Sequence, residues 1–547
     1  MAPLFFVSLA LACAGSRFGY VTLWALSVLA MLAAAWAGAV RAGTYSRITT
    51  ATLVFSLWVV FHTLLVSPAY TPAGLFHPLL LLVAFGAFRR FDVLTERRAV
   101  IAALALGAIL AAWGLVQIGP IGVARAHALF ETPATYATVV NLLLVPLLAL
   151  LLAGQRGIAL SVLGIALAAA LFATDSRGGF IALAAGLGTA AVLAARGGVL
   201  RRQTVLAVLG LVAAGWILVA GLRAVPFSVG MHEALPSAEA QAESSLSRLE
   251  LYELSARAWL ERPFAGTGYL TFRYVLERGR ASVPSYGESS ETWFVHNDYL
   301  QALQELGPLG LAGFLSLAWL PVLIVYRRMP TLPSADRSVA LAATSALTAT
   351  ACHALVDFPY HVPACLLLCG ALLGSLDRRI AGATAAASRP EEITSAHRAV
   401  RAACVVLAGA LLLRPVFAEV SAEWGLRLFA DRQSQSAAYW LEAARRVEPA
   451  DWRYHWYAGQ FWDDVASTTG SRDAARLANT AFAAGFEANP LEVRNLLGLI
   501  SLHRRHGDRL DAPANTAARA AWVAQAEALA PFNATVRRER HLLDAVK

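Results

Sequence analysis

The chain has little charge and a single lysine, Lys547. Only 15% of its 547 residues are charged, whereas a soluble domain carries about 25%. The net charge of +9 would suit a nucleic-acid-binding protein. The arginines, however, stand at the ends of apolar segments, where they act as signals of membrane orientation rather than as a phosphate-binding face. We therefore expect no nucleic-acid partner.

Cysteine is also scarce, and none of the five cysteines lies in a polar loop. We therefore expect neither a disulfide framework nor a zinc site. The sequence also lacks a P-loop, a GxGxxG pattern opening a βαβ unit, a GxSxG motif and a HExxH motif. Because no soluble nucleotide-binding domain is predicted, we expect no nucleotide-sugar donor. We also expect that the protein needs no metal and no cofactor.

Long apolar segments are what the chain has in abundance. Hydrophobic residues make up 58% of it, and a membrane span needs about 20 of them in succession. The sequence therefore predicts an all-α, polytopic membrane helix bundle. The predicted spans are residues 3–15, 21–40, 49–67, 73–88, 99–118, 134–153, 157–173, 179–195, 203–222, 304–326, 338–356, 362–377 and 400–416.

Arginine placement predicts the orientation of this bundle. Most arginines fall in alternate connections, and only Arg17, Arg125 and Arg177 fall in the short connections of the other side. Arginine-rich loops stay in the cytoplasm, so we expect a cytoplasmic N-terminus in a bacterial inner membrane. The predicted regions are residues 1–222 with nine spans, 223–303 as a large periplasmic loop with candidate catalytic segments, 304–416 with four spans, and 417–547 as a periplasmic tail.

The tail contains an internal repeat. Three Ala-rich segments end at Pro449, Pro490 and Pro531, which are 41 residues apart. Small residues followed by proline indicate stacked helix pairs of tetratricopeptide type, although the usual period is about 34 residues. The repeat suits a docking surface or a structural cap, and the sequence leaves both open.

Two arginine-containing clusters lie on the predicted periplasmic side, where a charge beside the membrane is a functional candidate. Ser176 and Arg177 precede a helix whose first N–H groups suit an anion. A tight turn in which Arg177 pairs with Asp175 is the alternative. Arg248 stands near the start of an amphipathic helix in the large loop and, taken alone, reads as a solvent-exposed side chain. Arg125 lies on the same side as both.

A third cluster leads from the large loop into the tenth span. His296 lies at the mouth of the bundle, where a neutral imidazole can serve as a general base. Gln301 and Glu305 are four residues apart and share a helix face. The alternative is a helix cap formed by Asn297 or Asp298 beside a hydrogen-bonded histidine.

A fourth cluster pairs His353 with Asp357, one helical turn later. The pair could orient a partner or bind a metal, but one histidine and one aspartate are too few ligands to predict a metal site. We favour a structural role.

Taken together, the clusters resemble the motifs of the O-antigen ligase and O-antigen polymerase superfamily. Residues 296–310 resemble its signature, and 176–178 resemble its periplasmic arginine motif. Residues 248–268 resemble its long-loop motif, and 353–363 a late motif of members with tetratricopeptide tails. The chain departs from the family at 131–134, where many members have an asparagine after the proline.

The resemblance implies a GT-C-like, inverting, metal-independent membrane glycosyltransferase. Its donor would be an oligosaccharide linked to undecaprenyl diphosphate in the lipid bilayer. Arg177 and Arg248 would bind the diphosphate, because guanidinium groups match phosphate oxygens in pairs. His296 would orient or deprotonate the acceptor hydroxyl. The expected substrate-binding residues are Ser176, Asn297, Gln301, Glu305, His353, Asp357 and Arg125.

The acceptor stays open. A polymerase would extend a second lipid-linked repeat unit, a ligase would use lipid A core, and a protein O-oligosaccharyltransferase would use Ser or Thr. We favour the polymerase, because the tail resembles members of capsule and exopolysaccharide systems and could bind polysaccharide-export proteins. A lipid-linked glycan transporter would need midplane charges in matching halves, which we do not find. A scaffold acting only through its tail is a third reading.

Overall fold

The computed structural model describes residues 2–18, 21–37, 46–224, 238–284, 292–382, 395–510 and 516–545. Over these ranges the chain is helical and contains no strand, so the predicted all-α class is confirmed. The helices before the tail are α1 (Ala2–Phe18), α2 (Val21–Ala37), α3 (Arg47–Phe61), α4 (Ala73–Arg90), α5 (Val93–Val116), α6 (Pro133–Leu152), α7 (Ile158–Ala173), α8 (Arg177–Arg196), α9 (Arg202–Ala224), α10 (Ala238–Glu261), α11 (Phe272–Gly279), α12 (Asp298–Arg328), α13 (Ser334–His353) and α14 (Pro363–Gly382).

Each predicted span falls on one of these helices or on α15 (Ser395–Ala430). Within the described residues, seven helices are long and apolar enough to cross a membrane, and three shorter helices are also apolar. The protein is therefore a multi-pass membrane protein. The helices α13 and α14 are long enough but are not among these seven. Both are largely buried among other helices, and both include polar and charged residues. Most side chains of span 400–416 lie outside the described residues, and thirteen spans remain a prediction.

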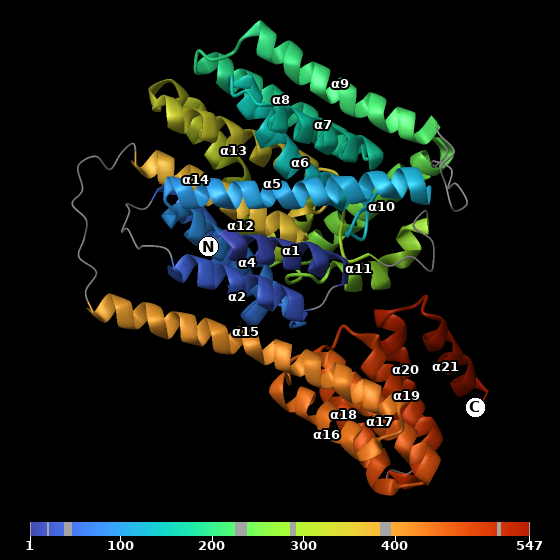
Figure 1. Ribbon diagram of the computed structural model, residues 1–547. Coiled ribbons are helices and arrows are strands. Elements are labelled where there is room, and N and C mark those ends of the chain that lie inside the picture. Colours follow the sequence, from blue (N-terminus) through green and yellow to red (C-terminus); the bar gives the residue numbers. More distant parts are fainter. Residues whose placement is uncertain are drawn as a thin grey trace.

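Small residues let the central helices approach closely. The helix α14 packs along α4, and α13 lies against α6 and α8 (Figure 1). A Cβ added at Gly370 would lie 2.4 Å from the carbonyl oxygen of Leu81, and one at Gly374 would lie 2.2 Å from that of Phe85. Glycines four residues apart are a common device for close packing of membrane helices.

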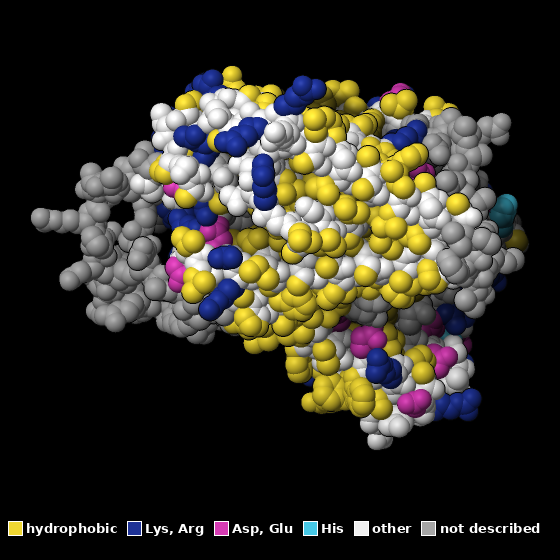
Figure 2. Space-filling model, turned by 45° about the horizontal axis from the view of Figure 1, so that its top comes forward, with side chains coloured by type: hydrophobic (Ala, Val, Ile, Leu, Met, Phe, Trp, Pro, Cys, Tyr) yellow, Lys and Arg dark blue, Asp and Glu magenta, His cyan; other side chains and the backbone are white. Residues whose placement is uncertain are grey.

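The outer surface carries a broad belt of hydrophobic side chains (Figure 2). On α9, for example, Leu206, Leu209, Trp216 and Ile217 are all exposed. Arginine side chains gather toward one end of this belt. Such a surface fits a helix bundle surrounded by lipid, with basic residues at one membrane boundary.

The tail continues from α15, which runs beside α2 before it reaches the tail helices. Each tail helix packs on the next one along the chain. The repeated prolines follow the ends of α16, α18 and α20, and the helix caps Asp451, Glu492 and Asn533 come two residues after them. The 41-residue repeat in the sequence therefore marks the turns that join α16 to α17, α18 to α19 and α20 to α21. The tail helices are α16 (Ser434–Val447), α17 (Trp452–Thr469), α18 (Arg472–Ala488), α19 (Val493–His506), α20 (Thr516–Leu529) and α21 (Ala534–Asp544).

Candidate functional site

Glu305 fastens the large loop to α12. Its carboxylate is buried and accepts hydrogen bonds from the backbone N–H of Leu270 at 2.9 Å and of Phe272 at 3.1 Å. Gln301 donates to the same carboxylate at 3.1 Å and accepts from the N–H of Val295 at 3.0 Å. The expected shared face of Gln301 and Glu305 is confirmed. The contacts of both residues are those of anchors for the loop.

Glycines make this attachment tight. Gly307 interrupts α12 with φ 71° and ψ −175°, a conformation that only glycine adopts without strain. A Cβ there would lie 2.2 Å from the carbonyl oxygen of Phe264. At Gly266, with φ +70°, a Cβ would lie 2.5 Å from the carbonyl oxygen of Glu305. Gly266 and Gly307 therefore allow the backbone of the large loop to pack directly against the backbone of α12.

His296 occupies the turn immediately before α12. Its φ is 59°, a left-handed value that costs a non-glycine residue energy and is often found at functional sites. Asn297 caps the helix, because its side-chain oxygen accepts from the N–H of Tyr299 at 3.1 Å and of Leu300 at 3.0 Å. The alternative reading of Asn297 as a helix cap is therefore confirmed, and substrate binding by Asn297 stays a prediction.

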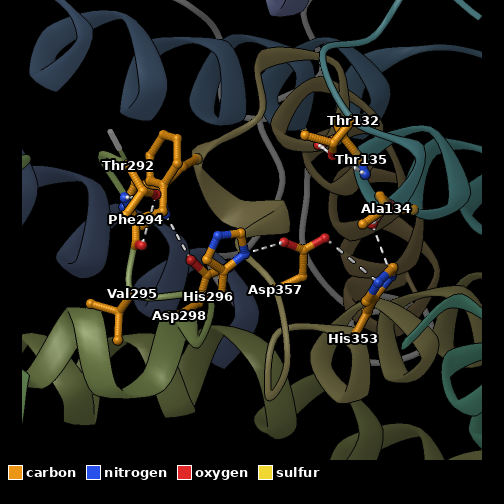
Figure 3. A network of polar contacts seen from close by, with 12 residues as sticks. Thr132, Ala134, Thr135, Thr292, Phe294, Val295, His296, Asp298, His353 and Asp357 are labelled. Carbon is orange, nitrogen blue, oxygen red and sulfur yellow. Dashed lines mark hydrogen bonds and ion pairs between the residues drawn. The ribbon is translucent and has the colours of Figure 1, made fainter. Parts of the chain in front are cut away.

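Asp357 lies between two histidines (Figure 3). Its Oδ1 is 3.3 Å from Nδ1 of His296, and its Oδ2 is 3.8 Å from Nε2 of His353. Nδ1 of His353 is in turn 2.8 Å from Oγ1 of Thr138 on α6. The side chain of His296 is 20% exposed and that of His353 only 1%. His296 is therefore the accessible member, and His353 lies behind Asp357.

The charge on Asp357 is well supported. Burial alone would raise the pKa of this carboxyl, but the hydrogen bond with His296 and the charges of His353, His296 and Arg248 lower it below its ordinary value of 3.8. The carboxylate is therefore ionised at neutral pH. With Nδ1 of His296 facing this carboxylate, Nε2 is the nitrogen that can meet a substrate.

The turn into α8 brings the arginine motif to the same region. Ser176 caps the helix by accepting from the N–H of Gly179 at 3.2 Å. Arg177 is the first helical residue and is exposed. A Cβ at Gly178 would lie 2.9 Å from Nε2 of His353. His353 thus fills the space beside Gly178, so the 176–178 motif packs against the 353–363 motif.

Three arginines act on one another here. Arg125 donates from Nε to the carbonyl oxygen of Thr174 at 2.9 Å and from Nη2 to that of Asp175 at 3.1 Å. Burial first, and then the charges of Arg248 and Arg177, lower the pKa of Arg125 against the opposing effect of Asp175. The three guanidinium groups are therefore within electrostatic range of one another, although they come from three separate segments.

Sequence reasoning gave no role to a second, buried network. Nδ1 of His361 lies 2.7 Å from Oδ1 of Asp298, and the hydroxyl of Tyr269 lies 2.9 Å from Nδ1 of His77. The ring of Tyr269 stacks on that of His361 at 5.6 Å. His77 stands inside an apolar span, which by itself marks a polar residue as a candidate. In the part of the chain that is described, no three His, Cys, Asp or Glu side chains gather as a metal site would require.

Comparison with known protein families identifies the family to which one domain of this chain is similar. Residues 162–315 match the family model described as O-antigen ligase. The chain carries an O-antigen ligase family domain. The matched segment runs from α7 into α12 and includes Arg177, Arg248 and His296, so the resemblance seen in the motifs is confirmed. The family comprises membrane glycosyltransferases of the ligase or polymerase type, and this protein is such an enzyme. No curated protein matches the chain.

Proposed function

We propose that this O-antigen ligase family protein transfers an oligosaccharide from undecaprenyl diphosphate to an acceptor hydroxyl, and that it polymerises repeat units of a surface polysaccharide. The observation that carries the proposal is the contact between His296 and Asp357 beside three arginines. The site would face the periplasm, with the N-terminus in the cytoplasm and the tail in the periplasm.

The arginines suit the donor. Negative charge grows on the diphosphate as its bond to the sugar breaks, and fixed cations stabilise that charge most where it develops. Arg177 and Arg248 would contact the phosphate oxygens, and the first N–H groups of α8 would add to their effect. Arg125 is committed to backbone carbonyls and contributes mainly through its charge.

His296 suits the acceptor. Its Nε2 would take the proton of the acceptor hydroxyl while the oxygen attacks the anomeric carbon. The bond from that carbon to the phosphate oxygen breaks, and its electron pair leaves with the diphosphate. A single displacement of this kind inverts the configuration. Asp357 would hold the ring and stabilise its protonated form, as in other His–Asp pairs.

The choice of polymerase rests on the tail, whose turns lie against the large loop. A ligase acting on lipid A core, or a protein O-oligosaccharyltransferase, would use the same arginines and histidine with a different acceptor. A transporter is disfavoured, because the charged groups lie together where loops meet helix ends.

Reconstitution tests the proposal. The purified protein is given only undecaprenyl-diphosphate repeat units, with EDTA present, and the products are sized on a gel. A ladder of lengths is expected, and His296→Ala should abolish it. Transfer only after lipid A core or a protein is added would assign a ligase or an oligosaccharyltransferase instead. A ladder made equally well by His296→Ala would remove the proposed base, and loss of the ladder in EDTA alone would overturn metal independence.

A further inference from the structure

A cavity of about 450 Å³ lies where bundle, large loop and tail meet. Pockets of about 300–1,000 Å³ with aromatic walls and a few polar groups are typical ligand sites. Within the described chain, its lining includes none of the three arginines assigned to the donor. Its lining residues include Trp24 and His77 from the bundle, Arg273 and Trp293 from the loop, and Trp452 and Arg494 from the tail.

The tail is fixed in place as one wall. Arg273 of α11 forms an ion pair with Glu492 at 2.6 Å, and both side chains are largely buried. Asn489 donates to the hydroxyl of Tyr274 at 2.6 Å. The guanidinium of Arg273 also lies 4.1 Å from the centre of the Trp293 ring. The turn between α18 and α19 is therefore held against the large loop by these contacts, and the start of α19 lines the cavity.

The cavity is adjacent to the proposed base. The rings of Phe294 and Phe358, which both line it, stack with centres 4.1 Å apart. Phe358 also contacts the ring of His296, with a distance of 5.0 Å between centres. Phe358 therefore contacts both the cavity and His296, although His296 is not one of the lining residues. A molecule that extends from the cavity past Phe358 would come close to His296.

One buried nitrogen in the cavity lining, Nε2 of His77, has no hydrogen-bond partner among the described residues. His77 is only 4% exposed. A buried polar nitrogen left unpaired is costly, and a sugar hydroxyl would satisfy it. Glu131 also lines the cavity and belongs to segment 131–134, where the chain departs from the family pattern. The departure therefore falls at this cavity and not at the arginines.

We propose that this cavity binds the acceptor saccharide, an inference that rests on the proposed function. The flat faces of its tryptophans suit the C–H faces of pyranose rings. Nε2 of His77 would form a hydrogen bond with one sugar hydroxyl group, and the carboxylate of Glu131 would accept hydrogen bonds from others. The tail would thus select the acceptor by completing its binding site, while the arginines hold the donor on the other side of His296.

The test uses full-length protein in lipid nanodiscs and the oligosaccharide released by mild acid from undecaprenyl-diphosphate repeat units. Saturation-transfer NMR should detect its binding to the wild type. Trp293→Leu and Glu131→Gln should weaken the signal and raise the acceptor KM by up to about tenfold, with kcat changed less than about twofold. Tyr439→Ala, at a residue that is 68% exposed on α16 and absent from the cavity lining, is the matched control and should change neither quantity.

The outcomes separate this inference from the proposed function. If the cavity variants bind and react as the wild type while His296→Ala is inactive, the cavity is not the acceptor site and the function stands. A wild type that gives no saturation transfer also overturns the inference. If His296→Ala retains full activity, the proposed function itself fails. Melting temperatures of all variants should match the wild type, and Trp293→Phe should restore KM if the aromatic face is what binds.

Discussion

Two of the His–Asp pairs among the described residues join the same two segments, with the histidine on a different segment in each pair. His296 contacts Asp357 at 3.3 Å, and Asp298 contacts His361 at 2.7 Å. In the first pair the histidine is 20% exposed, whereas in the second it is 7% exposed and its partner 1%. The atoms of the second pair are closer together and more deeply buried, and Oδ2 of Asp298 also accepts a hydrogen bond from the N–H of Tyr360 at 2.9 Å. Accessibility therefore distinguishes the pair proposed to act on substrate, His296–Asp357, from the buried pair, which joins the two segments.

The largest expected effect comes from removing each histidine in turn. His296→Ala should lower turnover by about 10²- to 10⁴-fold, the usual contribution of a general base. Its loss of stability should be smaller than that of His361→Ala, because Asp357 keeps His353 nearby. His361→Ala should instead lower stability by about 3–5 kcal/mol, because it leaves the buried carboxylate of Asp298 without its partner. Turnover per folded molecule and thermal melting in nanodiscs measure the two effects. Equal loss of stability in both variants would contradict the distinction.

A smaller effect is expected at the arginine that acts on the exposed pair. Arg248 lowers the pKa of Asp357 and belongs to the proposed donor site. Arg248→Ala should reduce kcat/KM for the lipid-linked donor by about 10²-fold, as loss of one stabilising group usually does. Arg248→Lys keeps the charge and should recover part of that loss. The acceptor KM should stay the same, and a change confined to it would argue against a donor role.

The smallest effect is a difference in how the two pairs respond to pH. The pKa of Asp357 is below 3.8, so its stabilising contribution is present above that value and is lost as pH falls through the lowered pKa. Burial would lower the pKa of His361, but Asp298 and Glu305 raise it above 6.5. The contribution of protonated His361 to stability is therefore fully present below pH 6.5 and is lost as pH rises through the raised pKa.

Melting curves across pH can detect this opposition. The difference between wild type and Asp357→Asn should shrink in acid, and the difference between wild type and His361→Gln should shrink toward alkaline pH. His361→Gln is preferred to alanine here because it can still donate to Asp298. Parallel pH profiles for the two variants would show that the pairs are not distinct.

The helices were predictable, and the detailed contacts were not. Helix positions follow from apolar segments and from local signals such as the Ser176 cap or the proline of each tail repeat. The i,i+4 pairs Gln301–Glu305 and His353–Asp357 also follow from local spacing, and both are in contact. The role of Glu305 did not follow, because its partners Leu270 and Phe272 lie more than 30 residues away along the chain.

The sequence by itself determined that this is a helical membrane protein, and its motifs pointed to the family that the comparison confirmed. Hydropathy, glycine positions and arginine placement are properties of short segments, so they can be read without the fold. Only the tertiary structure decided that His296 takes Asp357 and that His361 takes Asp298. It also placed Trp452 of the tail beside Trp293 of the loop in one cavity. Such choices depend on packing between segments far apart in the chain, where several partners of equal chemistry compete for the same position.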